Sequence, residues 1–236
     1  MPPRETGAIM DARPKLLSLH DDGAQLHAAV IGSDALDAIV RALADQPPDQ
    51  AGVRLFGLKW LRPLLQRDGV IGAIAAAAMS GEPRPVRAIL FDKTPASNWA
   101  LGWHQDRVIA VKKRVETPGF GPWTRKQGAL HVAPPFDLLS GMTTLRVHLD
   151  PVPSGNAPLR IAPGSHRRGR ITESEVGRLV DECGVFDCLA DAGDVWIYAT
   201  PILHASGRAA EPLRRRVLQV DYAQVALPGG LEWLGV

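Results

Sequence analysis

The pattern of apolar and polar positions divides the chain into a helical first part and a strand-rich remainder. From Ser33 to Leu43, apolar residues recur at intervals of three and four, which predicts an amphipathic helix that ends before the prolines at 47 and 48. An alanine-rich stretch at residues 68–79 predicts a second helix, which should stop near Gly81. We expect both helices to pack in one layer.

From residue 86 onward, the pattern changes to short apolar runs that are rich in β-branched and aromatic residues and are separated by turn residues. One helix, with a capping box at residues 172–175, interrupts them. This order of elements predicts a mainly β fold with flanking helices and a jelly-roll core, that is, a cupin-like double-stranded β-helix. The expected strands cover residues 86–91, 143–149, 159–162, 195–198 and 217–222.

Two segments depart from this regular pattern. Residues 1–15 are rich in proline and charge, which is typical of a flexible leader. Residues 112–137 are rich in glycine and proline and include the aromatic residues Phe120 and Trp123, which we expect to be exposed. A loop of this length inside a domain is typical of a lid over a binding site. The whole chain, residues 1–236, should form a single domain.

Composition narrows the class of protein. The 23 glycines and 20 prolines favour many turns over a helix bundle. A net charge of +2 does not indicate a nucleic-acid partner. The most apolar run, at residues 70–79, is too short to cross a membrane. Two cysteines do not make a disulfide framework, so we expect a soluble protein of the reducing cytoplasm.

Three of the seven histidines begin a His-x-Asp triplet, at His20, His104 and His148. Residues i and i+2 of a strand point the same way, so such a pair can bind one metal ion while a distant histidine completes a facial triad. His104 with Asp106 is favoured, because it is flanked by tryptophans and is followed by the expected lid. The His148 triplet precedes a proline-rich turn, where its aspartate would serve the turn, and the His20 triplet lies in a polar stretch.

The distant ligand has three candidates: His131, His166 and His204. His204 follows an expected strand at a hairpin end. His166 belongs to a turn that it would brace, and His131 lies in the expected lid, where it could reach a substrate. Eleven residues after His204 comes Arg215, which by strand alternation shares a side with Gln219 and differs in side from its arginine neighbours. A guanidinium there suits the carboxylate of a cosubstrate.

Together these motifs resemble the phytanoyl-CoA dioxygenase (PhyH-like) family of Fe(II)- and 2-oxoglutarate-dependent oxygenases, from about residue 86 to 222. The resemblance is carried by Phe91-Asp92-Lys93-Thr94-Pro95 with Asn98-Trp99, Trp103-His104-Gln105-Asp106, Leu159 through Pro163-Gly164-Ser165-His166, and His204-Ala205-Ser206 with Arg215.

The resemblance implies that His104, Asp106 and His204 bind Fe(II). It also implies that 2-oxoglutarate is held by residues of the second half of the chain, namely Arg215, Ser206 and Arg146. The expected reaction consumes O2 and hydroxylates a small organic molecule with release of succinate and CO2. The residues that we expect to line the substrate pocket are Trp103, Asn98, Trp123 and His131. Two alternatives are a cupin-like metal enzyme that does not use 2-oxoglutarate and a non-catalytic jelly-roll protein that binds a ligand.

Overall fold

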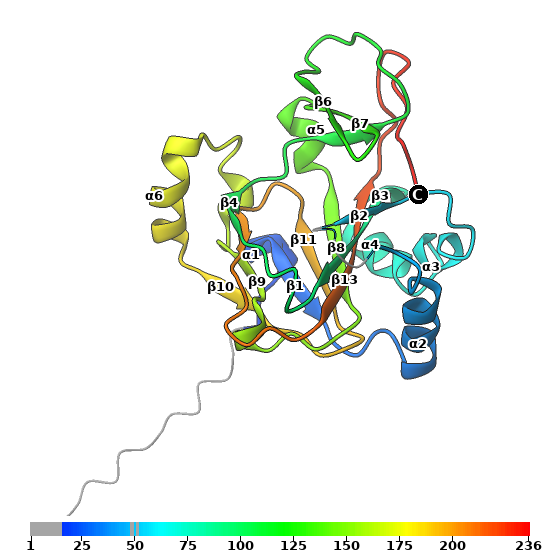
Figure 1. Ribbon diagram of the computed structural model, residues 1–236. Helices are drawn as coiled ribbons and strands as arrows, with labels where there is room; N and C mark the ends of the chain where they lie inside the picture. Colours follow the sequence, from blue (N-terminus) through cyan, green and yellow to red (C-terminus); the bar gives the residue numbers. More distant parts are fainter. Residues whose placement is uncertain (1–15, 48–49, 51) are drawn as a thin grey trace, which may run out of the picture.

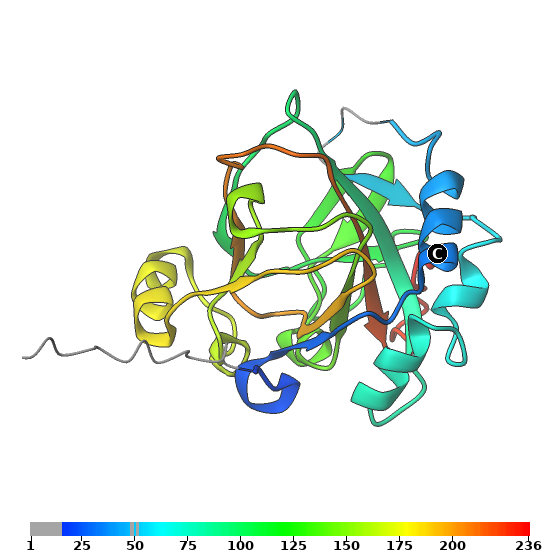
Figure 2. The same ribbon diagram turned by 90° about the horizontal axis from the view of Figure 1, so that it is seen from below.

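The computed structural model describes residues 16–47, 50 and 52–236, so the expected leader at residues 1–15 lies outside the described residues. Two antiparallel sheets and a smaller third one form the protein (Figures 1 and 2). The six-stranded sheet has the order β1 (Ala24–His27), β11 (Val195–Ala199), β8 (Thr143–His148), β13 (Arg215–Ala223), β3 (Arg84–Lys93), β2 (Val53–Leu55). The four-stranded sheet has the order β10 (Phe186–Cys188), β9 (Leu159–Ile161), β12 (His204–Ser206), β4 (Leu101–His104). The predicted jelly-roll fold is confirmed.

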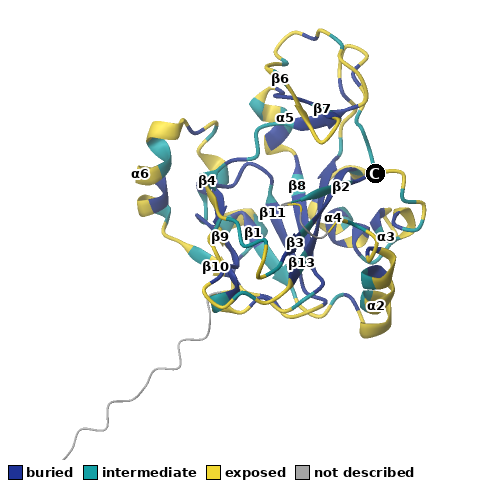
Figure 3. Cartoon of the chain, viewed as in Figure 1, coloured by how far each residue is buried: buried dark blue, intermediate teal, exposed yellow. Residues whose placement is uncertain are grey.

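Alternation along the central strands separates an apolar face of the large sheet from a polar one. On β8, Leu145 and Val147 belong to the main apolar core, whereas Arg146 between them lines a cavity. On β13, Leu218 belongs to the same apolar core, and its neighbour Gln219 lines the cavity. The sheet is therefore buried on both faces, as Figure 3 shows for its central strands, but the inner face carries polar groups.

Helices cover the apolar face of the large sheet (Figure 1). The first predicted helix is confirmed as α2 (Ser33–Ala42), and α3 (Arg62–Leu65) lies beside the second, α4 (Gly72–Ala78). This second helix begins later than predicted. Gly69 and Gly72 pack so closely on the backbone carbonyls of α3 and Gln66 that a side chain at either position would collide with them, and the chain turns there instead of continuing as a helix.

The remaining helices are α1 (Leu19–Asp22), α5 (Phe136–Ser140) and α6 (Glu173–Cys183), with short 3-10 turns at Ser154–Asn156 and Ser165–Arg167. Helix α6 opens with the predicted capping box, in which the Thr172 amide donates to Glu175 Oε2 at 3.0 Å. Cys183 ends this helix and Cys188 lies in β10, and both thiols are free. No helix in the described part of the chain has the length and apolar character that crossing a membrane requires.

The expected lid contains regular structure. Strands β6 (Trp123–Lys126) and β7 (Ala129–Val132) form a hairpin that joins β5 (Ile109–Val111) in the third sheet. The expectation that Phe120 and Trp123 are exposed is wrong. Both rings are partly buried in a cluster that includes Leu231 and Trp233, and β5 bridges to Trp233. The C-terminal segment therefore supplies apolar partners that a local view of the sequence does not reveal.

Candidate active site

Two histidines face each other across neighbouring strands of the small sheet. His104 at the end of β4 and His204 at the start of β12 are direct partners in the antiparallel pairing, and their ring centroids are 4.3 Å apart. Asp106 follows β4 by two residues. One ligand atom from each of His104, Asp106 and His204 lies within 4.8 Å of the other two. The structure therefore brings together the three residues that the sequence favoured as metal ligands.

Backbone carbonyls orient both imidazole rings. His104 Nδ1 donates to the Gly102 carbonyl at 2.8 Å, and His204 Nδ1 donates to the Ile202 carbonyl at 2.9 Å. Because a carbonyl only accepts, each Nδ1 carries a proton, and Nε2 is the atom of each ring that can bind a metal. Burial lowers the pKa of His204 to about 4, which keeps this imidazole neutral and able to bind a metal.

A buried arginine holds the third ligand. Arg87 Nη2 donates to Asp106 Oδ2 at 3.2 Å, while its Nε donates to Asp221. Thr144 Oγ1 also donates to Asp221, at 3.1 Å. Burial opposes ionisation of Asp106, but the charge of Arg87, together with smaller contributions from His204, His104 and Lys126, lowers the pKa of that carboxyl. Arg87 thus holds the Asp106 carboxylate in one orientation, as the hydrogen-bond partners of metal ligands commonly do.

This donor set fits iron. Two neutral imidazole nitrogens and one carboxylate oxygen on one side of a site form the 2-His-1-carboxylate triad, which leaves positions open for other ligands. No cysteine contributes, and none of the described acidic residues other than Asp106 joins the group.

The triad lies at a cavity of about 520 Å³ between the two sheets. At its β13 end, the side chain of Arg215 is buried, donates to the Ala157 carbonyl and reaches Ser206 Oγ at 3.5 Å. Its Nε has no hydrogen-bond partner in the described part of the chain. Burial and the nearby Arg146 lower the pKa of Arg215 to about 9. Such a desolvated cation is suited to an anionic ligand.

Lys93 is a functional candidate to which the sequence assigned no role. It pairs with Arg215 across β3 and β13, and its Nζ donates to the Gly207 carbonyl at 2.7 Å and to Ser206 Oγ at 3.4 Å. Burial, together with the charges of Arg215 and Arg146, lowers its pKa to about 7. The feature of the sequence that points to this role is a lysine at an inward position of a buried strand.

Arg146 also lines the cavity. Its Nη1 donates to Gln219 Oε1 at 2.9 Å, and its guanidinium lies 5.3 Å from the centroid of the Phe91 ring. No described residue forms a hydrogen bond with its Nε. The cavity therefore has a strongly basic end formed by inward positions of β3, β8 and β13.

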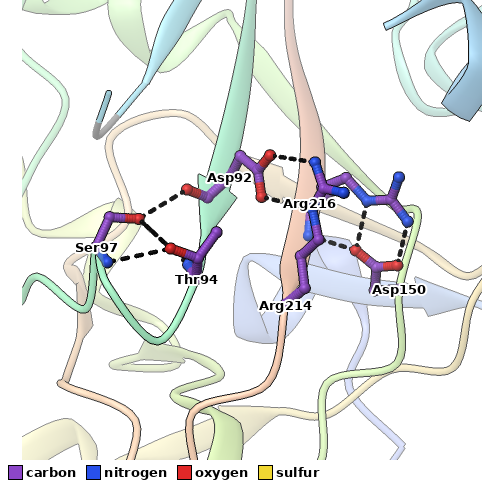
Figure 4. Close-up of polar contacts among 6 residues, drawn as sticks. All are labelled: Asp92, Thr94, Ser97, Asp150, Arg214 and Arg216. Carbon is purple, nitrogen blue, oxygen red and sulfur yellow. Dashed lines mark hydrogen bonds and ion pairs between the residues drawn. The ribbon is translucent and has the colours of Figure 1, made fainter. Parts of the chain in front are cut away.

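The arginines on either side of Arg215 point to the other face of the strand, as alternation predicts. Arg214 pairs with Asp92 at 2.8 Å and Arg216 pairs with Asp150 at 2.6 Å (Figure 4). The Arg216 amide also donates to Asp150, at 2.7 Å. These contacts occupy the aspartate of the alternative His-x-Asp pair, so His148 has no metal-binding partner there. Its own ring is buried, and neither nitrogen forms a hydrogen bond with any residue that the structure describes.

The four expected substrate residues do not line the cavity. Trp103 packs beside α6, and Trp123 packs in the apolar cluster under the hairpin. The amide of Asn98 exchanges two hydrogen bonds with the Ala209 backbone, which ties two loops together. His131 is fully buried in β7, and its Nε2 has no hydrogen-bond partner within the described ranges of the chain. The apolar lining comes instead from side chains that the sequence analysis did not assign to the substrate pocket, namely Ile89, Phe91, Trp99, Leu101, Val108 and Leu159.

Comparison with known proteins agrees with this geometry. The family model described as phytanoyl-CoA dioxygenase matches residues 62–217, a span that contains the whole triad and Arg215. No curated protein matches the chain significantly.

Several solved structures share the fold. AviO1 from Streptomyces viridochromogenes Tue57 is 22% identical, with a TM-score of 0.61 over 89% of this chain and 93% of that one. EctD from S. alaskensis, crystallised with 2-oxoglutarate and 5-hydroxyectoine, is 16% identical, with a TM-score of 0.67 over 92% and 77%. HygX from Streptomyces hygroscopicus, crystallised with nickel, 2-oxoglutarate and hygromycin B, is 17% identical, with a TM-score of 0.61 over 89% and 86%.

Proposed function

The chain belongs to the phytanoyl-CoA dioxygenase family and is a 2-oxoglutarate-dependent oxygenase, and we propose from this premise that it hydroxylates a small organic molecule with release of succinate and CO2. The observation that carries the proposal is the cross-strand pair His104 and His204 with Asp106, at one cavity with the buried Arg215. Structures of similar fold were solved with metal and 2-oxoglutarate, which supports the same cofactors here.

Fe(II) would be held by Nε2 of His104, Nε2 of His204 and the carboxylate of Asp106. Arg87 orients that carboxylate and is the largest of the charges that favour its ionised form. With these ligands in place, bound Fe(II) and 2-oxoglutarate supply the activation of O2 that oxidises a substrate C–H bond. Because Asp106 occupies the carboxylate position, a halide has no vacant position there, which favours hydroxylation over halogenation.

The far carboxylate of 2-oxoglutarate would be bound by the Arg215 guanidinium and the Ser206 hydroxyl. Ser206 already lies within 3.5 Å of Arg215 Nη1 and 3.4 Å of Lys93 Nζ, so the three groups form one anion-binding end. Arg146 adds positive charge from the adjacent strand. The apolar side chains around the cavity exclude water from the reacting atoms and hold the carbon skeleton of the substrate.

The test is an anaerobic titration with Fe(II) and 2-oxoglutarate, in which the visible charge-transfer band of the chelate is recorded. The wild-type protein should show the band, and His104→Ala should lose it. His20→Ala is the matched control, because His20 is exposed and lies in α1. A wild-type protein without the band, or an undiminished band in His104→Ala, would contradict the proposed function.

A further inference from the structure

The cavity carries more positive charge than the proposed cofactors use. Asp106 is the only acidic residue that lines it in the described part of the chain, against six basic residues, namely Arg54, Arg87, Arg107, Lys126, Arg146 and Arg215. Fe(II) and the dianion of 2-oxoglutarate cancel each other in charge, so cofactor binding does not remove this excess.

Most of these cations have a partner or an assigned ligand. Arg87 is balanced by Asp106 and Asp221, and Arg215 lies at the end assigned to the far carboxylate of 2-oxoglutarate. The other four form no ion pair with any described residue. Of these, Arg146 lies at the 2-oxoglutarate end and donates to Gln219, and Arg107 donates to the Ile171 carbonyl. That leaves Arg54 and Lys126. Both lie at the hairpin side of the cavity.

Strand alternation points Arg54 into the cavity. Its neighbours Val53 and Leu55 on β2 pack against the apolar core, so the Arg54 side chain lies on the opposite face, beside Ile89 of β3. The Nε atom of Arg54 is buried and has no hydrogen-bond partner among the described residues. Burial, followed by the charge of Arg87, lowers the pKa of Arg54, which means that the folded protein leaves this cation undercompensated.

The tip of the β6–β7 hairpin brings Lys126 to the same place. Gln127, the next residue, accepts a hydrogen bond from Arg54 Nη1 at 3.0 Å and donates to the Gly52 carbonyl at 2.6 Å. The hairpin is thus tied to the edge strand that carries Arg54. Lys126 lines the cavity, whereas Arg125, one position earlier on β6, does not.

We propose that Arg54 and Lys126 bind an anionic group, a carboxylate or a phosphate, on the substrate of the oxygenase. This inference rests on the proposed function and names its substrate class. An arginine fork and a lysine charge together match the oxygens of such a group. The neighbouring Ile89, Phe91 and Leu101 would contact an apolar body. The substrate is therefore a small acid with a hydrocarbon part, and a cationic substrate is disfavoured by repulsion.

The experiment measures binding of three probes with one hydrocarbon chain: hexanoate, hexyl phosphate and the neutral hexanamide. Each is titrated calorimetrically into anaerobic protein loaded with Fe(II) and 2-oxoglutarate. The variants are Lys126→Ala, Arg54→Gln and Lys126→Arg. Arg125→Ala is the matched control, because Arg125 is exposed and donates only to the nearby Gly128 carbonyl at 3.3 Å.

At least one of the two acids should bind wild type about tenfold more tightly than hexanamide, the effect of one charge-assisted hydrogen bond. In Lys126→Ala and in Arg54→Gln, the preference for that acid over hexanamide should fall by about the same factor. Lys126→Arg and Arg125→Ala should keep the wild-type preference. Comparison of the two acids separates a carboxylate site from a phosphate site. The proposal is overturned if neither acid binds better than hexanamide, or if Arg125→Ala loses as much affinity as Lys126→Ala. In either case, an intact charge-transfer band shows that the proposed oxygenase function is unaffected. A missing band would overturn both.

Discussion

His104 and His204 are direct partners in the pairing of β4 with β12, and each ring is held by the carbonyl two residues earlier, Gly102 within β4 and Ile202 just before β12. The register of two strands, rather than the conformation of a loop, therefore sets the distance between the two nitrogen ligands. Sites built on strands hold their geometry closely. Of the three ligands, only Asp106 lies outside a strand, and its ion pair with Arg87 restrains its side chain instead.

Replacing Arg87 with methionine should destabilise the protein strongly. Arg87 is buried between Asp106 and Asp221, and its loss leaves Asp221 as an uncompensated buried charge. We expect the free energy of unfolding to fall by about 3–5 kcal/mol, measured by urea denaturation. The control is Arg178→Met on α6, whose exposed pair with Glu182 should contribute less than about 1 kcal/mol. Similar losses in the two variants would contradict the role given to Arg87.

Replacing Arg215 with glutamine should weaken binding of 2-oxoglutarate by about 10- to 100-fold, because a charged hydrogen bond to the far carboxylate is lost. The affinity is measured from the anaerobic charge-transfer band. Arg214→Gln is the matched control, because Arg214 pairs with Asp92 on the other face of the strand (Figure 4) and should change the affinity less than twofold. An unchanged affinity in Arg215→Gln would favour a metal enzyme that does not use 2-oxoglutarate.

Local sequence patterns were enough for the central strands, for helices α2 and α6, and for the pair His104 and Asp106. The His-x-Asp spacing marked His104 with Asp106, and alternation placed Arg215 on the inner side of its strand. Each of these patterns involves residues only a few positions apart, so it can be recognised in the sequence. That His204 pairs with His104 follows from strand register across 100 residues, and before the structure it rested on a family resemblance.

What sequence reasoning missed depends on contacts between distant segments. Arg87 meets Asp221, 134 positions away, and no local pattern links them. Trp103 and Trp123 were expected at the substrate, but α6 and the C-terminal segment offer them apolar partners. An aromatic residue near a motif packs wherever the fold provides an apolar surface, so the motif does not predict its contacts. A buried lysine such as Lys93 is more informative, because its charge requires a polar environment.

Two glycines should respond to alanine with opposite signs. Gly193 has φ of +92°, and an added Cβ would lie 2.5 Å from the Ile31 carbonyl oxygen, so Gly193→Ala should lose at least about 2 kcal/mol of unfolding free energy. Gly177 lies inside α6 with open space around it, so Gly177→Ala should gain about 0.5–1 kcal/mol. Thermal unfolding measures both. A neutral result for Gly193→Ala would mean that the turn before β11 can rearrange.

The buried ring of His148 should make stability fall in mild acid. Burial, with the charges of Arg146 and Arg215, lowers its pKa to about 3, whereas in the unfolded chain a histidine has a pKa of about 6.5. Between these values the unfolded chain binds more protons than the folded one, so the unfolding free energy rises with pH there by about 1.4 kcal/mol per pH unit. Stability is therefore greatest above pH 6.5 and is lost as the pH falls toward 3.

In urea denaturation of the metal-free protein, His148→Leu should reduce the difference in stability between pH 7 and pH 5 by about 2 kcal/mol. His20→Gln, which changes an exposed ring, should leave that difference unchanged. If His148→Leu keeps the full difference, the folded protein must accommodate a protonated His148 between two arginines, and the basic end of the cavity would have to be more open to water than its buried side chains indicate.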